Sequence, residues 1–167
     1  MVFAAVHAQR CRSLVAIGAP ISAYPLKDRL RTQALVALYR TTGPQEIVVE
    51  AVTKALLSAR TRQDDPEALE LVRSSFTGAD RAGTLNAVES IWLHRPDLTP
   101  MLSLVRVPTL FITGTAHPDW SPEQAQDAAG LLPHGSAEAI DGTAYLAALE
   151  APEEVAGLVR RFWASAS

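Results

Sequence analysis

The sequence of 167 residues predicts an α/β fold with a short parallel sheet of about three strands, flanking helices and an inserted helical cap. Two observations predict this class. Short apolar runs occur near both ends of the chain and alternate there with helical patterns, as expected for parallel strands. Between the first two runs lies a block of four helical patterns, which is too long for a simple crossover and indicates an insertion.

Three segments are typical of strands. In the first, Ser13 is followed by three apolar residues and Ile17, and the run stops at a glycine and a proline. The second covers residues 109–113 and stops at Gly114, and a weaker third covers residues 137–140. Continuous apolar runs of this length are typical of strands buried on both faces of a sheet.

The central block predicts helices at residues 28–39, 44–59, from 65 onward and 80–92, with Pro44 at a first helical position. A helix also precedes the first strand at residues 1–9. After the block, residues 97–100 resemble a helix start, Ser121 and Pro122 begin a helix that lasts to about residue 132, and Pro152 opens the last helix. We therefore expect a core made of residues 1–27 and 97–167, with a cap at residues 28–96.

Composition excludes several classes of protein. The net charge is −3, and the 15 Lys and Arg residues are scattered, so no basic stripe indicates nucleic acid or an anionic membrane. The single cysteine, Cys11, allows no intrachain disulfide. No apolar run reaches the ~20 residues that span a bilayer, and the N-terminus does not resemble a signal peptide. We expect a cytoplasmic protein.

Several phrases, taken together and in order, resemble the α/β-hydrolase family. They cover essentially the whole chain, and they imply a partial α/β-hydrolase fold, the portion that follows the nucleophile turn. The phrases are Arg12-Ser13-Leu14-Val15-Ala16-Ile17-Gly18-Ala19-Pro20, Pro96-Asp97-Leu98-Thr99-Pro100-Met101-Leu102, Val107-Pro108-Thr109-Leu110-Phe111-Ile112-Thr113-Gly114 and Glu150-Ala151-Pro152-Glu153-Glu154-Val155.

The resemblance also indicates what is missing. The family's serine stands in a G-x-S-x-G turn between a strand and a helix, and this sequence contains no such motif. Met1 aligns just past that turn. We therefore expect the upstream strands and one loop of the oxyanion hole to be absent from this chain.

The other two triad positions are changed as well. By the resemblance, His117 occupies the family's acid position, Asp119 lies two residues further on, and Tyr145 falls where the family's histidine is expected. A tyrosine with a pKa near 10 cannot replace a base that titrates near neutrality. An imidazole cannot supply the negative charge that stabilises an imidazolium. These degenerate positions predict no serine hydrolysis by this chain.

Other uses of these residues stay open. His117 and Asp119 could form a new acid–base pair, although a surface loop and its turn explain them more simply. Asp119, His117 and His134 lack any metal-ligand spacing, so no metal or cofactor is expected. Cys11, between two arginines, could have a lowered thiol pKa, but packing in the core is the simpler interpretation.

These observations predict a truncated or degenerate hydrolase, a pseudoenzyme that acts as a binding or structural module and holds a small apolar ligand under its cap. The alternative is a hydrolase of small esters, active only when a longer precursor or a partner chain supplies the N-terminal half. The strand from Ser13 to Ile17 would lack an upstream neighbour, and unpaired strand edges favour association. We therefore expect self-association, or a partner chain, at this edge.

Overall fold

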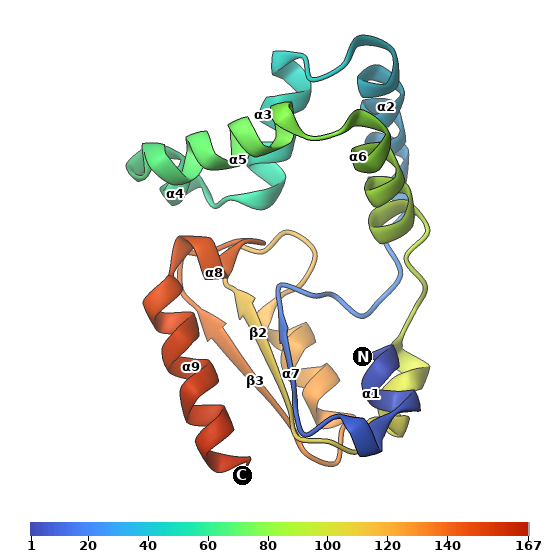
Figure 1. Cartoon of the computed structure of the whole chain (residues 1–167), viewed down its shortest axis with the longest axis vertical. Helices are drawn as coiled ribbons and strands as arrows, with labels where there is room; N and C mark the ends of the chain where they lie inside the picture. Colours follow the sequence, from blue (N-terminus) through green and yellow to red (C-terminus); the bar gives the residue numbers. More distant parts are fainter. Residues whose placement is uncertain (167) are drawn as a thin grey trace.

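The computed structural model describes residues 1–166, and a three-stranded parallel sheet forms its centre (Figure 1). The strands are β1 (Leu14–Ile17), β2 (Thr109–Gly114) and β3 (Gly135–Ile140), in the order β1-β2-β3. In the register, Thr109 lies opposite Leu14 on one side and opposite Gly135 on the other. Each residue of β2 is buried, as expected for the central strand. The predicted α/β class with a short parallel sheet is confirmed.

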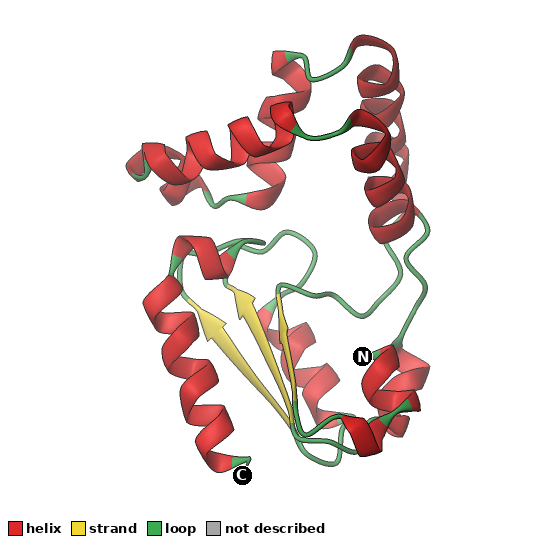
Figure 2. Ribbon diagram, viewed as in Figure 1, coloured by secondary structure: helices red, strands yellow, loops and turns green. Residues whose placement is uncertain are grey.

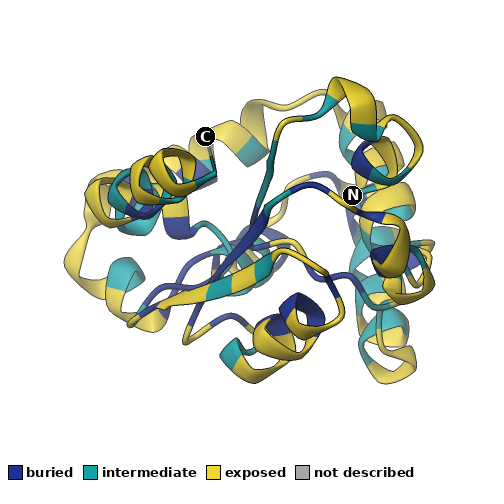
Figure 3. Cartoon of the chain, turned by 90° about the horizontal axis from the view of Figure 1, so that it is seen from below, coloured by how far each residue is buried: buried dark blue, intermediate teal, exposed yellow. Residues whose placement is uncertain are grey.

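Helices cover both faces of this sheet. On one face lie α1 (Val2–Val6), η3 (Thr99–Leu104) and α7 (Pro122–Gly130), and on the other lie α8 (Ala147–Glu150) and α9 (Pro152–Ser165). The short 3-10 helix η1 (Ala8–Arg10) follows α1. Successive side chains of β2 point to opposite faces of the sheet. Phe111 therefore packs with the first set of helices, while Leu110 and Ile112 pack with the second. Figure 3 shows buried residues concentrated along the strands and on the helix sides that face them.

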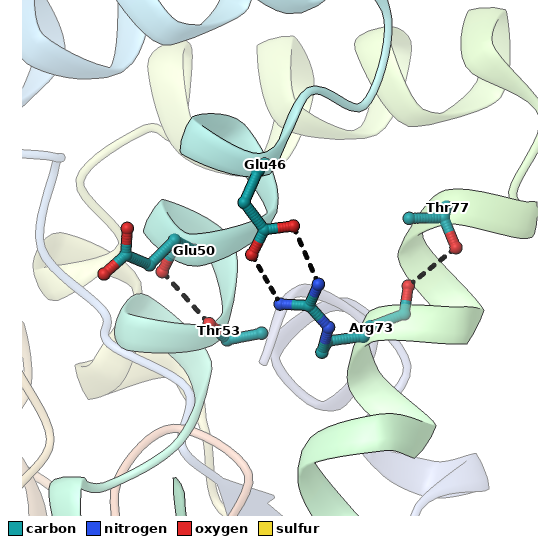
Figure 4. Close-up of polar contacts among 5 residues, drawn as sticks. All are labelled: Glu46, Glu50, Thr53, Arg73 and Thr77. Carbon is teal, nitrogen blue, oxygen red and sulfur yellow. Dashed lines mark hydrogen bonds and ion pairs between the residues drawn. The ribbon is translucent and has the colours of Figure 1, made fainter.

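The cap helices are α2 (Leu26–Thr42), α3 (Glu46–Leu56), α4 (Ala59–Asp64), α5 (Pro66–Gly78) and α6 (Arg81–Val88), which continues into the π-helical turn η2 (Glu89–Leu93). They lie beyond the carboxyl ends of the strands (Figure 2). Ser58, Asp65 and Asp80 each accept a hydrogen bond from a backbone N–H in the first turn of the helix that follows. A bidentate ion pair joins α3 to α5, with Arg73 Nη1 and Nη2 2.9 and 2.8 Å from the Glu46 carboxylate oxygens (Figure 4).

Local details differ from the sequence prediction. Pro44 is not a first helical residue, because α3 begins at Glu46 with Gln45 as its N-cap. The helix also does not reach residue 59. It ends at Leu56, because Ser58 caps a separate helix, α4, which the pattern did not predict. The segment at residues 99–104 is a 3-10 helix.

One carboxylate joins the cap to the core. Glu150, at the end of α8, accepts hydrogen bonds from the Ser58 amide (2.9 Å), the Thr61 hydroxyl (2.6 Å) and the Ala144 amide (2.8 Å). Nearby, the Leu146 amide donates to the Leu56 carbonyl at 3.1 Å. Since Ser58 and Thr61 belong to the cap and Ala144 follows β3, this side chain fixes the near end of the cap over the sheet.

The outer edge of β1 has no strand beside it among the described residues. The Leu14 and Gly18 amides donate to Pro108 and Ile112, so alternate residues of β1 pair with β2. Val15 and Ile17 therefore direct their amides and carbonyls to the open side. Next to this edge, three apolar side chains of α1 are exposed: Val2 by 50%, Phe3 by 51% and Val6 by 59% of their surface. Such exposure is high for apolar side chains.

Among residues 1–166, no helix combines the length and the apolar character that crossing a membrane requires.

Candidate functional site

Three loops meet at the carboxyl end of the sheet, beneath the cap. Gly18 follows β1, His117 follows β2, and Tyr145 follows β3. Two glycines allow this meeting. A Cβ on Gly18, whose φ is +54°, would lie 2.5 Å from the Tyr145 carbonyl oxygen, and a Cβ on Gly114 would lie 2.0 Å from that of Thr143. The fold thus brings together His117 and Tyr145, the two positions at which the family resemblance leads one to expect triad residues.

The side chains at this point form a column of rings. The rings of His117 and Tyr145 have centroids 4.7 Å apart, and the other neighbour of Tyr145 is Trp92, stacked at 5.6 Å with an interplanar angle of 16°. Trp92 comes from the π-helical turn of the cap, and Tyr24 meets it edge to face at 5.8 Å. Aromatic pairs of this geometry are attractive beyond the area that they bury. The cap and the core are therefore in contact through the site itself.

His117 is buried, with 7% of its surface exposed, which corrects the expectation of a surface loop. Packing against Tyr145 removes it from water. Its Nδ1 accepts a hydrogen bond from the Asp119 amide at 3.1 Å, so the neutral ring carries its proton on Nε2. Burial lowers the pKa of His117 to about 4, an effect that the backbone of Gly18 partly offsets and the charge of Arg95 reinforces. Nε2 is close to Gly18, yet it has no hydrogen-bond partner among the described residues.

Asp119 contacts His117 through its backbone, and the structure gives no hydrogen bond or ion pair to its carboxylate within residues 1–166. Burial raises the pKa of this carboxyl; the positive charge of Arg95 opposes the rise, and the negative charge of Asp28 adds to it. His134 lies elsewhere, just before the amino end of β3. No three His, Cys, Asp or Glu side chains in the described chain form a group that could hold a metal ion.

Tyr145 is a weak acid in this setting. Burial raises the pKa of its phenol above 10, Asp119 adds to the rise, and Arg95 opposes it. The hydroxyl is therefore protonated at neutral pH and cannot accept a proton from a nucleophile. The site supplies two aromatic rings in tilted contact where the family resemblance leads one to expect an acid and a histidine.

A pocket of about 520 Å³ opens between the cap helices and the loop after β2. Its wall is mainly apolar, and its polar groups include Tyr24 and Asp119 at the core end. This is the size and character of a small-molecule site. Sequence patterns placed the cap but gave no sign that Tyr24, Trp92 and Arg95 would gather here. Apolar wall residues include Leu35, Val36, Tyr39, Val48, Val52, Phe76, Leu85 and Val88.

Cys11 lies away from this site. It is partly buried against the apolar core on the α7 side of the sheet, and its Sγ donates to the Ser13 carbonyl oxygen at 3.3 Å. This surrounding is that of a packed side chain.

The sheet, the cap over its carboxyl ends and the loops that meet there make this chain a partial α/β-hydrolase fold. Solved structures support this conclusion. A thermophilic esterase from Thermogutta terrifontis superposes with a TM-score of 0.85 at 22% identity, over 98% of this chain and 60% of that one. An enol-lactonase from Burkholderia xenovorans LB400 superposes with a TM-score of 0.82 at 21% identity, over 98% of this chain and 60% of that one. MenH from S. aureus superposes with a TM-score of 0.78 at 20% identity, over 93% of this chain and 59% of that one.

This chain thus spans about 60% of the length of those structures. At such identities the likeness is one of fold. No family model matches the sequence, and no curated protein does.

Proposed function

We propose that this chain is a ligand-binding module on part of an α/β-hydrolase scaffold, without hydrolytic activity of its own. The observation that carries the proposal is the apolar pocket of about 520 Å³ beside the His117–Tyr145 ring pair. A pocket of this kind can hold a small apolar ligand by burying its surface. We further propose that residues 28–96 act as the cap and that the protein works in the cytoplasm.

The chemistry of the site supports the absence of hydrolysis. The printed sequence has no G-x-S-x-G turn, so no activated serine stands beside the ring pair. His117 has a pKa of about 4 and is a weak base, and Tyr145 holds its proton. A serine supplied from elsewhere would thus still lack an efficient proton acceptor.

Ligand binding is tested by calorimetric titration with 4-phenylbutanol, a small neutral apolar probe. Val52→Trp places a large ring in the pocket wall and is expected to abolish binding. Ile47→Trp, on the exposed side of the same helix, is the matched control and is expected to bind normally. Equal affinities for the two variants, or no binding by the unchanged chain, would contradict the proposal.

We also propose that another strand covers the open edge of β1, from a second copy or from a separate chain. The outward amides and carbonyls of Val15 and Ile17 and the exposed apolar side of α1 support this. Hydrogen exchange combined with light scattering tests it. A dimer with slow exchange at Val15 indicates self-association, and a monomer with fast exchange leaves the edge for a separate chain. A monomer with slow exchange would contradict the proposal.

A proline variant sharpens the edge experiment. Val15→Pro removes an amide from the open side and leaves the ladder to β2 unchanged, because Val15 does not donate to β2. It is expected to abolish association, whereas Val15→Thr, which keeps the amide and the branched shape, retains it. Far-UV circular dichroism verifies that both variants fold.

The open edge also supports a second function, hydrolysis of small esters after assembly with a chain that carries the N-terminal half. Its test is the turnover of p-nitrophenyl butyrate. This function predicts no turnover by the 167-residue chain and turnover on addition of a chain that contains G-x-S-x-G. The Tyr145→His variant of the mixture should then be faster, because it restores a base. Absence of turnover in every mixture would exclude this function.

A further inference from the structure

The core end of the pocket contains a carboxylate without an ion-pair partner among residues 1–166. Asp119 lines the pocket and is partly buried, and its carboxylate forms no hydrogen bond or ion pair within residues 1–166. A carboxylate in such a place has lost part of its hydration without gaining a partner. A group that supplies hydrogen-bond donors and positive charge would restore what burial removes.

The neighbouring arginine does not fill this role. Arg95 is close enough to influence Asp119, but its Nε donates to the Ser22 carbonyl oxygen at 2.8 Å and its guanidinium lies over the Tyr24 ring, 5.6 Å from the centroid. It forms no ion pair with Asp119 among the described residues. Asp28 lines the same pocket and adds a second negative charge near Asp119.

Two cations also line the pocket, and both are on exposed positions of the cap. Lys54 pairs with Glu50 at 2.6 Å, and Arg31 lies on the exposed side of α2. The pocket is therefore apolar along the cap helices, with an unpaired acid at the end nearest the core.

We propose that the ligand is a small amphipathic amine, whose ammonium group binds Asp119 and whose apolar body packs among the cap helices. This inference rests on the proposed ligand-binding function. An ammonium supplies three donors and a charge to the carboxylate, and charge-assisted hydrogen bonds are the stronger ones in a partly dry site. The hydrocarbon body gains from burial against residues such as Val52, Phe76 and Leu85.

Three probes of one shape test the inference: 4-phenylbutylamine, 4-phenylbutanol and 4-phenylbutyrate, titrated at pH 7. The amine is expected to bind about tenfold or more tightly than the alcohol, and the carboxylate to bind weakest. Asp119→Asn should remove the preference for the amine and leave the alcohol unchanged. Asp119→Glu should retain the preference, and Asp127→Asn, which removes an exposed acid from α7, should behave as the unchanged chain.

The outcomes separate the two proposals. If none of the three probes binds, the ligand-binding function fails and this inference fails with it. If the alcohol binds at least as tightly as the amine, or Asp119→Asn keeps the preference, the binding function survives and the assignment of an amine is wrong. Thermal unfolding of each variant verifies that a lost preference does not come from a lost fold.

Discussion

The rings of His117 and Tyr145 lie 4.7 Å apart with an interplanar angle of 32°. By the family resemblance these are the positions of an acid and a histidine, which exchange a hydrogen bond in a working triad. Here the same two loops meet through ring faces, and Trp92 of the cap extends the stack. The two loops that the resemblance assigns to a triad therefore meet here through aromatic rings.

Truncating the central ring of this stack should cost stability. Tyr145→Ala removes the contacts with His117 and Trp92, and we expect it to lower the free energy of unfolding by about 2 kcal/mol. Tyr145→Phe keeps both ring contacts and is expected to be nearly neutral. Urea denaturation followed by circular dichroism measures the difference. Equal losses in the two variants would mean that the hydroxyl, and not the ring, provides the stability.

Stability should fall as the pH is lowered from about 6.5 toward 4. His117 has a pKa of about 4 in the folded chain, below its ordinary value of 6.5, so the unfolded chain binds a proton first. The contribution of neutral His117 to the free energy of unfolding is fully present above pH 6.5. It amounts to about 3 kcal/mol and is lost once the pH has fallen through 4. The raised pKa of Asp119 acts in the opposite direction near the acid end.

Comparison of His117→Asn with the unchanged chain isolates this effect. The variant should lose the dependence between pH 6.5 and 4, and His134→Asn, at an exposed position, should keep it. The measurement is the urea midpoint as a function of pH. Parallel profiles for all three proteins would show that His117 titrates normally in the folded chain.

Among the acidic residues, Glu150 should be the one whose substitution lowers the free energy of unfolding most. Glu150→Ala leaves the amides of Ser58 and Ala144 without their acceptor, and we expect a loss of about 2–3 kcal/mol. Glu150→Gln retains one acceptor oxygen and should lose less. Hydrogen exchange at the two amides should accelerate in proportion. Glu153→Gln, exposed on α9, is the control and should leave both amides protected.

Two glycines should respond to alanine in opposite ways. Gly114→Ala forces a Cβ to within 2.0 Å of the Thr143 carbonyl oxygen, and we expect at least ~4 kcal/mol of destabilisation or failure to fold. At Gly130, in the last position of α7, nothing lies within 4 Å of a new Cβ. There alanine should stabilise by about 0.5 kcal/mol, because it restricts the unfolded chain. Thermal unfolding of the two variants is the measurement.

Sequence patterns predicted β1 and β2 because each is a short apolar run that stops at a glycine, and they predicted β3 more weakly from residues 137–140. They also predicted α7, since Ser121 and Gln124 form a capping box around Pro122. They failed between Leu56 and Pro66, where α3 ends, α4 begins and ends, and α5 begins within a few residues. The boundary there is set by the Ser58 hydroxyl, which accepts a hydrogen bond from the Thr61 amide and so begins α4.

The candidate site was predicted only in part. His117 and Tyr145 could be named because the family resemblance aligns them with the positions of an acid and a histidine. The burial of His117 could not, since it depends on the Tyr145 ring and on two close approaches at glycine. The place of Asp119 at the pocket, opposite side chains from the cap, is likewise set by long-range packing that no local pattern records.

The register of the sheet has a consequence for how the chain acquires its structure. Leu14 pairs with Thr109, so β1 can pair with β2 only after the whole cap has been synthesised. The cap helices depend on nearby contacts and can form early, whereas closing so long a loop is slow. During that delay the side of β1 that pairs with β2 is bare, and an unpaired apolar strand edge favours aggregation.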